Sequence, residues 1–176
     1  MNQPTHFIYG MNIALFYVNT QGLNGLEYFD SILFTGFAAL IPDIDHPGSA
    51  ISKVLKPVSK VFNALERLIM PSSMQHRGIT HTLVPLALAY GGWHFTHFKS
   101  IMFTGQGIAT HIFLDLFTKM GVPLLWPLTK FRLKIPLFKT GGKGEEMVSV
   151  IGWVLFFTQI LCNLNVFKEV IEWLRY

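Results

Sequence analysis

Residues 147–164, MVSVIGWVLFFTQILCNL, contain no charged side chain. A helix needs about 17 to 25 mostly apolar residues to cross the hydrocarbon core of a bilayer, and this segment has that length. Only 14% of the whole chain is charged and 51% is hydrophobic, whereas ordinary soluble domains are about a quarter charged. The sequence therefore predicts an all-α membrane protein.

Four further apolar stretches accompany this segment. Residues 79–98 and 100–118 are apolar apart from histidines and one aspartate, and we expect both to span the membrane. Residues 5–18 and 28–42 lie near or below spanning length, which fits buried or half-inserted helices. We therefore expect one domain, residues 1–176, built as a membrane helical bundle of about four to five hydrophobic helices.

Basic residues concentrate in two of the predicted loops. Loops 43–78 and 119–146 hold eleven of the 14 Lys and Arg residues. With five crossings, both loops share one face with the N-terminus, and the positive-inside rule makes that face cytoplasmic. The net charge of +4 comes without the aromatic-interleaved basic patch typical of nucleic-acid binders. We therefore expect membrane lipids as partners and no nucleic acid.

Within the first of these loops, SKVLKPVSKVFNALERLIM predicts a short amphipathic helix, because its apolar residues recur every three to four positions. It is suited to lying on an anionic lipid surface or to packing on the bundle, and Pro57 marks its start or a kink. Lys53, Lys56 and Lys60 on its other side would draw anionic headgroups toward the site. Residues 130–138, KFRLKIPLF, predict an extended interfacial segment.

Side chains capable of chemistry gather near one predicted end of the helices. They are His6; Asp43, Asp45 and His46 in IPDIDHPGS; His76, Arg77, Thr80 and His81 in HRGITH; His111 and Asp115 in HIFLD; and Glu145 and Glu146 in TGGKGEE. Carboxylates beside an apolar segment are costly unless water, a cation or other polar groups meet them. Their convergence predicts a metal centre on the cytoplasmic side, with the polar residues collected at one end of the bundle.

Spacing and chemistry both fit a metal ion. His111 and Asp115 are four residues apart, so on a helix their side chains share a face. Imidazole and carboxylate ligands without thiolate suit Zn²⁺, Mn²⁺ or Fe²⁺ better than Ca²⁺. The single cysteine, Cys162, excludes an internal disulfide and a cysteine-based zinc cluster.

Each of these residues, taken alone, has a simpler interpretation. A histidine can be an interfacial or hydrogen-bonded side chain, Asp43 a turn or cap residue, and Arg77 part of the positive-inside charge. Glu145 can simply favour a helix N-terminus. His94 and His97 fit an aromatic belt at the opposite end of their segment, and we leave them out of the site.

The motifs PDIDHPGS, HRGITHTL and HIFLDLFTKMGVPLLWP resemble the signatures of the YdjM-like family of LexA-regulated, inner-membrane-associated, metal-dependent hydrolases. The likeness runs from THFIYG through TGGKGEE, with Thr82 where Ser is common. It implies a helical protein of the bacterial inner membrane that carries a metal centre and is distantly similar to zinc-dependent phospholipase C. The polar positions that match the motifs, which the resemblance implies are metal ligands, are His6, Asp43, Asp45, His81, His111 and Asp115.

These observations together predict a multi-pass, metal-dependent hydrolase that acts on a phosphoester or phospholipid-like substrate at the cytoplasmic leaflet. One or two divalent ions, zinc or manganese, would activate water. Asp45 or Glu145 would serve as base, and Arg77 and His76 would hold the phosphate. The alternative is a non-catalytic membrane protein that binds metal or other proteins. Transport is disfavoured because the polar groups cluster at one end, and the oligomeric state stays open.

Overall fold

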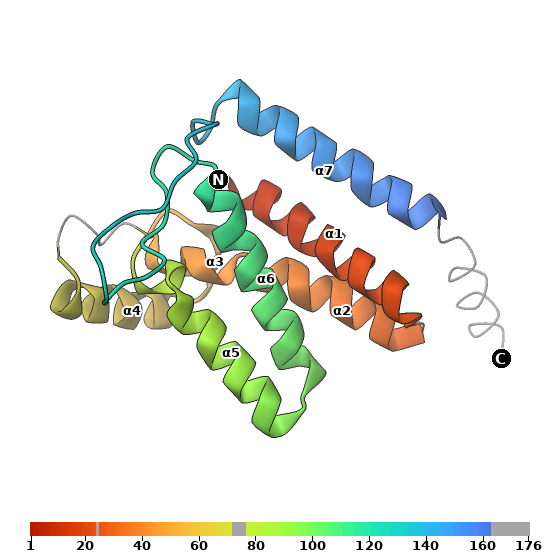
Figure 1. Cartoon of the computed structure of the whole chain (residues 1–176), viewed down its shortest axis with the longest axis horizontal. Coiled ribbons are helices and arrows are strands. Elements are labelled where there is room, and N and C mark those ends of the chain that lie inside the picture. The colour runs from red at the N-terminus through yellow and green to blue at the C-terminus, as the bar shows by residue number, and fades with distance from the viewer. Residues whose placement is uncertain (24, 72–76, 163–176) are drawn as a thin grey trace.

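The computed structural model describes residues 1–23, 25–71 and 77–162, and the regular elements of this part of the chain are helices (Figure 1). The prediction of an all-α fold is confirmed. In chain order the elements are α1 (Gln3–Gln21), α2 (Gly25–Ala38), the 3₁₀ turn η1 (Ile41–Asp45), α3 (Ala50–Val54), α4 (Lys56–Ile69), the 3₁₀ turn η3 (Ile79–His81), α5 (Leu83–Thr96), α6 (Lys99–Leu116) and α7 (Lys143–Cys162).

Helix boundaries follow from local sequence. Pro4 and Pro57 occupy the first turns of α1 and α4, where a missing backbone N–H costs nothing, so Pro57 marks a helix start. Gly22 ends α1 in the left-handed conformation, with φ of 64°. Thr82 caps α5, because its hydroxyl oxygen accepts a hydrogen bond from the Val84 N–H at 3.1 Å.

Helices α1 and α6 both pack tightly against the C-terminal end of α2. A Cβ atom at Gly10 of α1 would lie 2.8 Å from the Thr35 carbonyl oxygen, and one at Gly107 of α6 would lie 2.5 Å from that same oxygen. Only glycine allows backbones to approach this closely. His6 and His111 lie one helical turn from these glycines, so the close packing brings both histidines to the same end of the bundle.

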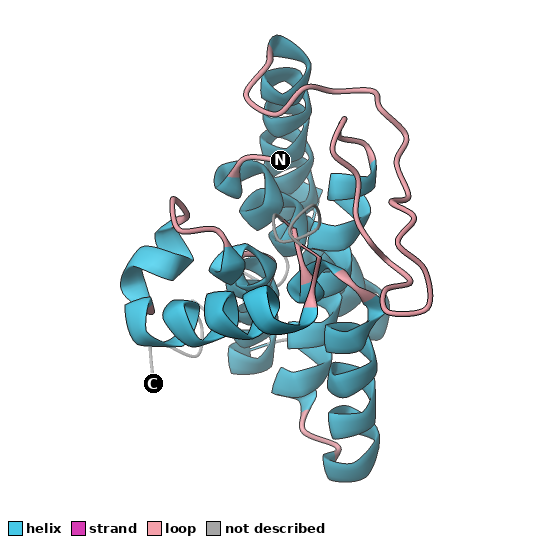
Figure 2. Ribbon diagram, turned by 90° about the vertical axis from the view of Figure 1, so that its left-hand side faces the viewer, coloured by secondary structure: helices cyan, strands magenta, loops and turns pink. Residues whose placement is uncertain are grey.

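The apolar core lies mainly where α1 packs between α2 and α7 (Figure 1). Its buried side chains are Ile8, Ala14, Leu15, Val18, Tyr28, Ile32 and Phe156. A smaller cluster joins α6 to the long loop that follows it, through Ile108, Ile112 and the fully buried Val122. That loop runs along one side of the bundle before α7 begins (Figure 2).

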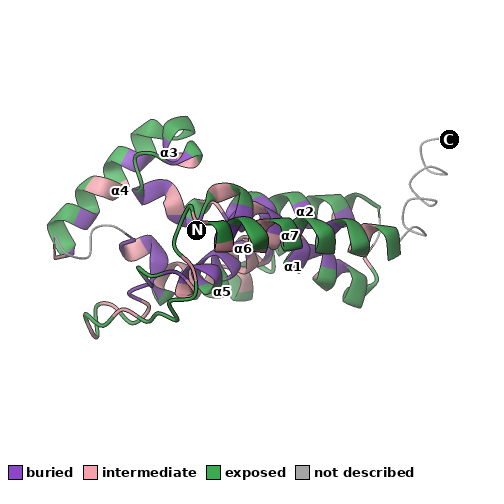
Figure 3. Cartoon of the chain, turned by 90° about the horizontal axis from the view of Figure 1, so that it is seen from above, coloured by how far each residue is buried: buried purple, intermediate pink, exposed green. Residues whose placement is uncertain are grey.

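Among the described helices, α7 alone is long and apolar enough to cross a membrane. It contains most of the predicted segment 147–164, and much of its surface is exposed (Figure 3). The predicted span 79–98 forms a helix of only 14 residues, because residues 79–81 leave the helical path as η3. That helix is shorter than a span requires, so a bundle with several membrane spans stays a prediction.

The predicted surface helix is present as two pieces, α3 and α4, which meet at Leu55. Helix α4 is fixed to η1, because the buried Ser59 hydroxyl donates to the Ile44 carbonyl oxygen at 2.8 Å. Residues 130–138 are non-helical as predicted, and Leu133 exchanges two backbone hydrogen bonds with Val122. The predicted surface elements therefore exist and are anchored to the same end of the bundle as η1.

Candidate metal centre

The structure brings six predicted residues together at one end of the bundle, although four elements far apart in the sequence supply them. Helix α1 provides one histidine, the turn η1 two aspartates, the turn η3 one histidine, and α6 the last pair: His6, Asp43, Asp45, His81, His111 and Asp115. The turn η1 contains Pro42 in its first turn, and η3 directly follows Gly78. Such short turns let the chain reverse at the end of a helix while its side chains point inward.

Two overlapping groups of side chains have the composition and spacing of metal sites. One consists of His6, His111 and Asp115, and the other of Asp43, His81 and His111. Within each group the ligand atoms lie within 4.8 Å of one another. His111 belongs to both groups, so the arrangement suits either one ion or two neighbouring ions that share this residue.

The pair of His81 and His111 is the most informative part of the cluster. Their Nε2 atoms lie 3.1 Å apart, and both rings are fully buried. His111 Nδ1 donates to the Ala39 carbonyl oxygen at 2.6 Å, because that oxygen can only accept. The proton of a neutral His111 therefore sits on Nδ1, and its Nε2 lone pair faces His81.

Two facing lone pairs repel each other, so this contact requires a proton or a cation between the two Nε2 atoms. Nitrogens bound to one tetrahedral Zn²⁺ at about 2.0–2.1 Å are separated by about 3.3 Å. The observed 3.1 Å between the Nε2 atoms is close to that value. The imidazole pair thus fits two adjacent positions around one ion.

Asp45 stands behind His81 and is not in either ligand group. Its Oδ2 accepts hydrogen bonds from Gly78 N at 3.1 Å and from the Thr80 hydroxyl at 2.8 Å, and lies 3.5 Å from His81 Nδ1. Burial alone would raise the pKa of Asp45, but His81, Thr80 and Gly78 lower it below its usual value. A carboxylate of low pKa is a weak base. This geometry indicates that Asp45 orients His81, while its predicted roles as ligand and base stay predictions.

Asp115 is enclosed by positive or potentially positive groups. Arg77 Nη2 donates to its Oδ1 at 3.0 Å, and Arg77 Nε lies 2.9 Å from its Oδ2 in an ion pair without hydrogen-bond alignment. The amino group of Met1 also contacts Oδ1. Arg77 is 6% exposed and has a positive φ of 58°, so the backbone is held in an unusual conformation that turns this side chain inward.

Within the described residues, neither ring nitrogen of His6 has a hydrogen-bond partner, although both nitrogens are buried. The ring stacks on that of His111 with centroids 3.6 Å apart, and its Nε2 lies 3.4 Å from Asp115 Oδ1. A buried polar atom without a partner is costly. A cation bound by His6, His111 and Asp115 would satisfy His6 Nε2, so the residues present fit a metal ion.

The charge state of His81 without a cation is fixed by its neighbours. Burial lowers the pKa of an imidazole, but here the hydrogen bonds and charges of Asp115 and Asp45 outweigh that effect and raise the pKa of His81 to about 9. At neutral pH the ring is therefore protonated between two carboxylates. A metal ion that binds this ring must displace the proton.

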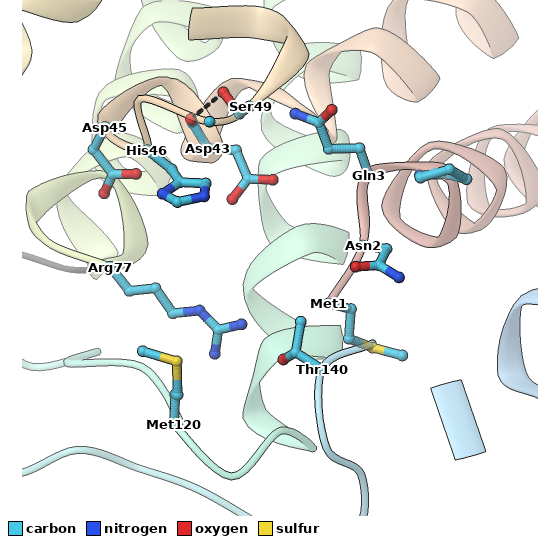
Figure 4. Close-up of a pocket in the computed structure, with 12 residues that line it drawn as sticks. Met1, Asn2, Gln3, Asp43, Asp45, His46, Ser49, Arg77, Met120 and Thr140 are labelled. Atoms are coloured by element: carbon cyan, nitrogen blue, oxygen red, sulfur yellow. Dashed lines mark hydrogen bonds between the residues drawn. The ribbon is translucent and has the colours of Figure 1, made fainter. Parts of the chain in front are cut away.

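The cluster borders an open pocket of about 450 Å³. Asp43 and Asp45 lie on one side of it and the Arg77 side chain reaches in from another, as Figure 4 shows. His46, exposed at the rim, and Thr140 also line the pocket. A negatively charged substrate in this space would meet Arg77 and any ion held beside Asp43.

Glu145, a predicted catalytic residue, lies outside both ligand groups. Glu145 is 1% exposed, and its carboxylate accepts hydrogen bonds from the backbone N–H groups of Asn2 and, at 2.6 Å, Gly141. Glu145 therefore ties the start of α7 to the start of α1, and its predicted role as a base stays a prediction. His76 lies outside the described residues, and the exposed Glu146 lies beyond both ligand groups.

Sequence reasoning missed Glu66 of α4, whose carboxylate contacts the backbone of η3. It is 1% exposed, and its Oε1 accepts from the Ile79 N–H at 2.9 Å. Burial and the charge of Asp45 raise the pKa of Glu66 to about 7. A Cβ atom at Gly78 would lie 2.1 Å from that Oε1, which explains the glycine. One signal in the sequence could have indicated this role. Glu66 is the acidic residue of a helix whose other charged residues are basic, and it lies seven residues after Ser59, so the two side chains share one face of the helix.

With the geometry in place, comparisons of the sequence agree with one family. The sequence model of the family described as "YdjM inner membrane protein" matches residues 1–170. The chain belongs to the YdjM family. Inner membrane protein YdjM of Escherichia coli (strain K12) is 30% identical over 167 residues, which cover 89% of this chain and 80% of that protein, and the Shigella flexneri protein of that name matches equally.

Bacillus subtilis also carries a relative. The protein YvsG of Bacillus subtilis (strain 168) is 33% identical over 126 residues, or 68% of this chain and 73% of YvsG. No solved structure matches the chain. Membership of the YdjM family shows that this is a protein of the bacterial inner membrane, in agreement with the resemblance of its motifs.

Proposed function

We propose that this YdjM-family protein is a membrane-bound, metal-dependent hydrolase that acts on a phosphoester or phospholipid-like substrate. The observation that carries the proposal is the buried contact between His81 and His111, whose Nε2 atoms face each other at 3.1 Å while His111 Nδ1 is held by a carbonyl oxygen. An arrangement that fixes the second nitrogen of a histidine is characteristic of metal-ligating imidazoles.

His6, His111 and Asp115 would hold one ion, and Asp43 with His81 and His111 would hold a second or complete the first. Zinc and manganese suit this set of imidazole and carboxylate ligands. A bound ion of this kind would lower the pKa of water and polarise a phosphoryl oxygen. Asp45, through Thr80 and His81 Nδ1, keeps His81 in the orientation that presents Nε2.

Phosphate chemistry is supported by the charge of the pocket. Arg77 lines it, and its guanidinium is held by Asp115 and by the Thr118 hydroxyl at 2.5 Å. A guanidinium fixed in this way binds phosphate oxygens with defined geometry. The location of the protein in the inner membrane, and the basic loops expected on the cytoplasmic side, favour a lipid-derived substrate on that leaflet.

A second candidate function is non-catalytic metal binding, and one observation favours it. Arg77 already neutralises Asp115 with two contacts of 2.9 and 3.0 Å, as in a structural ion-pair network. A structural metal site is closed, whereas a catalytic site keeps one position for water or substrate. The open pocket beside Asp43 favours the catalytic alternative.

The test begins with metal content. We would purify the full chain in a neutral detergent without chelators and measure bound metals by mass spectrometry for the wild type, His111→Ala and His94→Ala. His111→Ala removes the residue shared by both ligand groups, and the exposed His94 is the matched control. We expect stoichiometric zinc or manganese in the wild type and in His94→Ala, and its loss in His111→Ala.

Activity is measured next, on the same preparations. We would follow hydrolysis of a soluble phosphodiester and of phospholipids in vesicles, before and after removal and return of the metal. Metal-dependent cleavage that His111→Ala abolishes would support the hydrolase. Bound metal without cleavage of either substrate would favour the non-catalytic alternative, and absence of metal from a folded wild type would refute both functions.

A further inference from the structure

A second open groove, of about 330 Å³, lies between α4 and the chain around Pro47 and Ser52. It is separated from the candidate metal centre by the turn that follows η1, and among the described residues no carboxylate or imidazole lines it. Its polar lining comes largely from one face of α4, namely Lys56, Lys60 and Arg67 together with Ser59 and Asn63. A groove with cationic side chains and no metal-ligating ones is suited to an anion.

The three basic residues form one stripe along the helix. Lys60 follows Lys56 by four residues and Arg67 follows Lys60 by seven, and these spacings place all three on one face. All three side chains are exposed, and none of them forms an ion pair within the part of the chain that the structure describes. The acidic residue of α4, Glu66, is buried against η3 and does not line the groove.

The opposite face of α4 is apolar and exposed. Val58, Val61, Leu65 and Leu68 recur at spacings of three and four residues and are 42%, 58%, 47% and 82% exposed. In Figure 3, α3 and α4 project beyond the end of the bundle with largely exposed outer surfaces. An amphipathic helix of this kind, rich in Lys and Arg on its polar face, is typical of helices that lie in the membrane interface.

The thickness of a helix allows both faces of α4 to contact one phospholipid molecule. A helix is about 10–12 Å thick with its side chains, and an interfacial helix sinks about 5–10 Å into the boundary between headgroups and acyl chains. With the apolar stripe at the acyl chains, the basic stripe therefore lies at the level of the lipid phosphates. Anionic lipids enrich that level in negative charge, which complements Lys56, Lys60 and Arg67.

We propose that this groove binds the phosphate of an anionic phospholipid, while the apolar stripe of α4 contacts the acyl chains. The bound lipid anchors α4, and through the hydrogen bond from Ser59 to Ile44 it steadies η1, the turn that carries Asp43 and Asp45. This lipid is a structural ligand and is not cleaved, because no metal-ligating group reaches the groove. The inference does not depend on the hydrolase activity proposed above.

The test counts bound lipids on the full chain in a neutral detergent by native mass spectrometry. Short-chain phosphatidylglycerol, short-chain phosphatidylcholine and inorganic phosphate are titrated separately. The groove variant is Lys56→Gln/Lys60→Gln/Arg67→Gln, and the matched control, Lys119→Gln/Lys130→Gln/Lys134→Gln, removes equal charge from exposed residues of the loop after α6. Circular dichroism verifies that both variants remain helical.

We expect the wild type and the control to bind phosphatidylglycerol alike, and the groove variant to bind it more than about tenfold more weakly, since each basic residue near a lipid surface contributes about 1 kcal/mol. An equal loss in the control would show unspecific charge attraction and overturn the site. Groove-dependent binding of inorganic phosphate as tight as that of phosphatidylglycerol would reassign it to free phosphate. If Val61→Gln/Leu65→Gln converts a dimer to a monomer and leaves lipid binding unchanged, the apolar face joins two copies and the proposal fails.

Discussion

Helices α6 and α7 are similar in length, with 18 and 20 residues, but their surroundings are opposite. Helix α6 packs its Gly107 against the backbone of α2 and directs His111 and Asp115 into a fully protein-lined interior. Helix α7 lies along α1 and leaves apolar side chains such as Val150 and Val154 about 60% exposed, at 61% and 59%.

The difference teaches where each helix obtains its stability. On α6, polar groups that would be costly in an apolar medium are satisfied by other protein groups, so the candidate metal centre depends on close backbone distances. On the exposed face of α7, apolar side chains such as Val150 and Val154 have little protein cover, and only lipid or another apolar surface removes them from water. Substitutions where α6 packs on α2 should therefore damage the candidate site, and substitutions on the exposed face of α7 should damage membrane integration.

The largest effect should come from filling the contact between α6 and α2. In Gly107→Val the new side chain would meet Thr35 O, Ala38 Cβ and Ala39 N, whose distances from a Cβ atom are 2.5, 2.7 and 2.7 Å. Because two of these atoms belong to the backbone, α2 must move, and the 2.6 Å bond from His111 to Ala39 O is lost. We expect a loss of about 3 kcal/mol or more of stability, together with loss of bound metal.

The control for that change is Gly91→Ala on α5. A Cβ atom there meets nothing within 4 Å, and alanine is favoured over glycine inside a helix by about 0.5–1 kcal/mol. Thermal unfolding in detergent should therefore show opposite shifts for the two variants. Equal stability of Gly107→Val and the wild type would contradict the close packing of α2 and α6.

A smaller loss is expected when a charge is placed on the exposed face of α7. Val154→Arg puts a cation near the middle of the candidate span, which costs about 2.5 kcal/mol on insertion scales. The fraction of protein that stays in the membrane after alkaline extraction should fall, whereas Val154→Leu should leave it unchanged. Full retention of Val154→Arg would show that this face does not meet lipid.

The same measurement on Phe113→Arg tests α6, where Phe113 is 57% exposed. A bundle with several membrane spans predicts a loss like that of Val154→Arg, since the exposed side of α6 would then face acyl chains as well. A normal membrane fraction for Phe113→Arg, beside a reduced one for Val154→Arg, would restrict the membrane span to α7.

The next effect concerns pH and Glu66, whose pKa is raised from 4.5 to about 7. An acid with a raised folded pKa binds its proton more tightly in the folded state, so its contribution to stability is present below about pH 4.5 and is lost as pH rises toward about 7. In metal-stripped protein, the free energy of unfolding of Glu66→Gln, compared with that of the wild type, should therefore increase by about 2 kcal/mol when the pH is raised from about 5 to about 8.

Thermal unfolding at the two pH values measures this gain. Glu146→Gln changes an equivalent functional group on an exposed part of α7 and is the matched control. If the wild type and Glu66→Gln lose stability in parallel across the range, the carboxyl of Glu66 is not desolvated beneath η3.

The smallest effect is expected where α7 meets α1. Asn12 Nδ2 donates to the carbonyl oxygens of Ile8 and Gly152, both at 2.9 Å, and its Oδ1 accepts from Gln159 at 2.7 Å. Hydrogen bonds between membrane helices contribute about 1 kcal/mol, so Asn12→Leu should weaken the packing of α7 on α1 by about that free energy. Faster hydrogen exchange in α7 with retained metal would show that the two helix contacts are independent.

The control is Asn19→Leu, at an exposed position of α1, which should change neither hydrogen exchange in α7 nor the amount of bound metal. Loss of metal from Asn12→Leu would show instead that the packing of α7 supports the metal centre, and the separation between the two helix contacts would then be wrong.

Several features of this protein were readable from local sequence because local physics decides them. The interval of four residues between His111 and Asp115 puts both on one face of any helix, and Pro57 starts α4 because it lacks an N–H. Most of the uncharged run within 147–164 lies in α7, the helix that is long and apolar enough to cross a membrane among those described. The segment 79–98 was predicted too long, because the pattern of apolar residues continues through η3 although the backbone turns away.

The roles of the acidic residues were not readable in the same way. Asp43 and Asp45 are two residues apart, yet the first belongs to a ligand group and the second orients His81 through hydrogen bonds. Glu145 has the sequence context of a free acid, but the N–H groups of Asn2 and Gly141 occupy it. Each role depends on which distant group faces the carboxylate.

The sequence by itself determined that this chain is helical, that it belongs in the inner membrane, and that histidines and aspartates gather near helix ends. The helical, membrane-bound character and the spacing of polar residues follow from composition, periodicity and short-range spacing, and the inner membrane follows from the resemblance of the motifs to the YdjM-like family. Only the tertiary structure decided which imidazole nitrogens face each other, because the Ala39 carbonyl that fixes His111 lies 72 residues away along the chain. Close glycine contacts of α1 and α6 with α2 bring His6 and His111 to one end of the bundle, so the candidate metal centre depends on where those backbones touch.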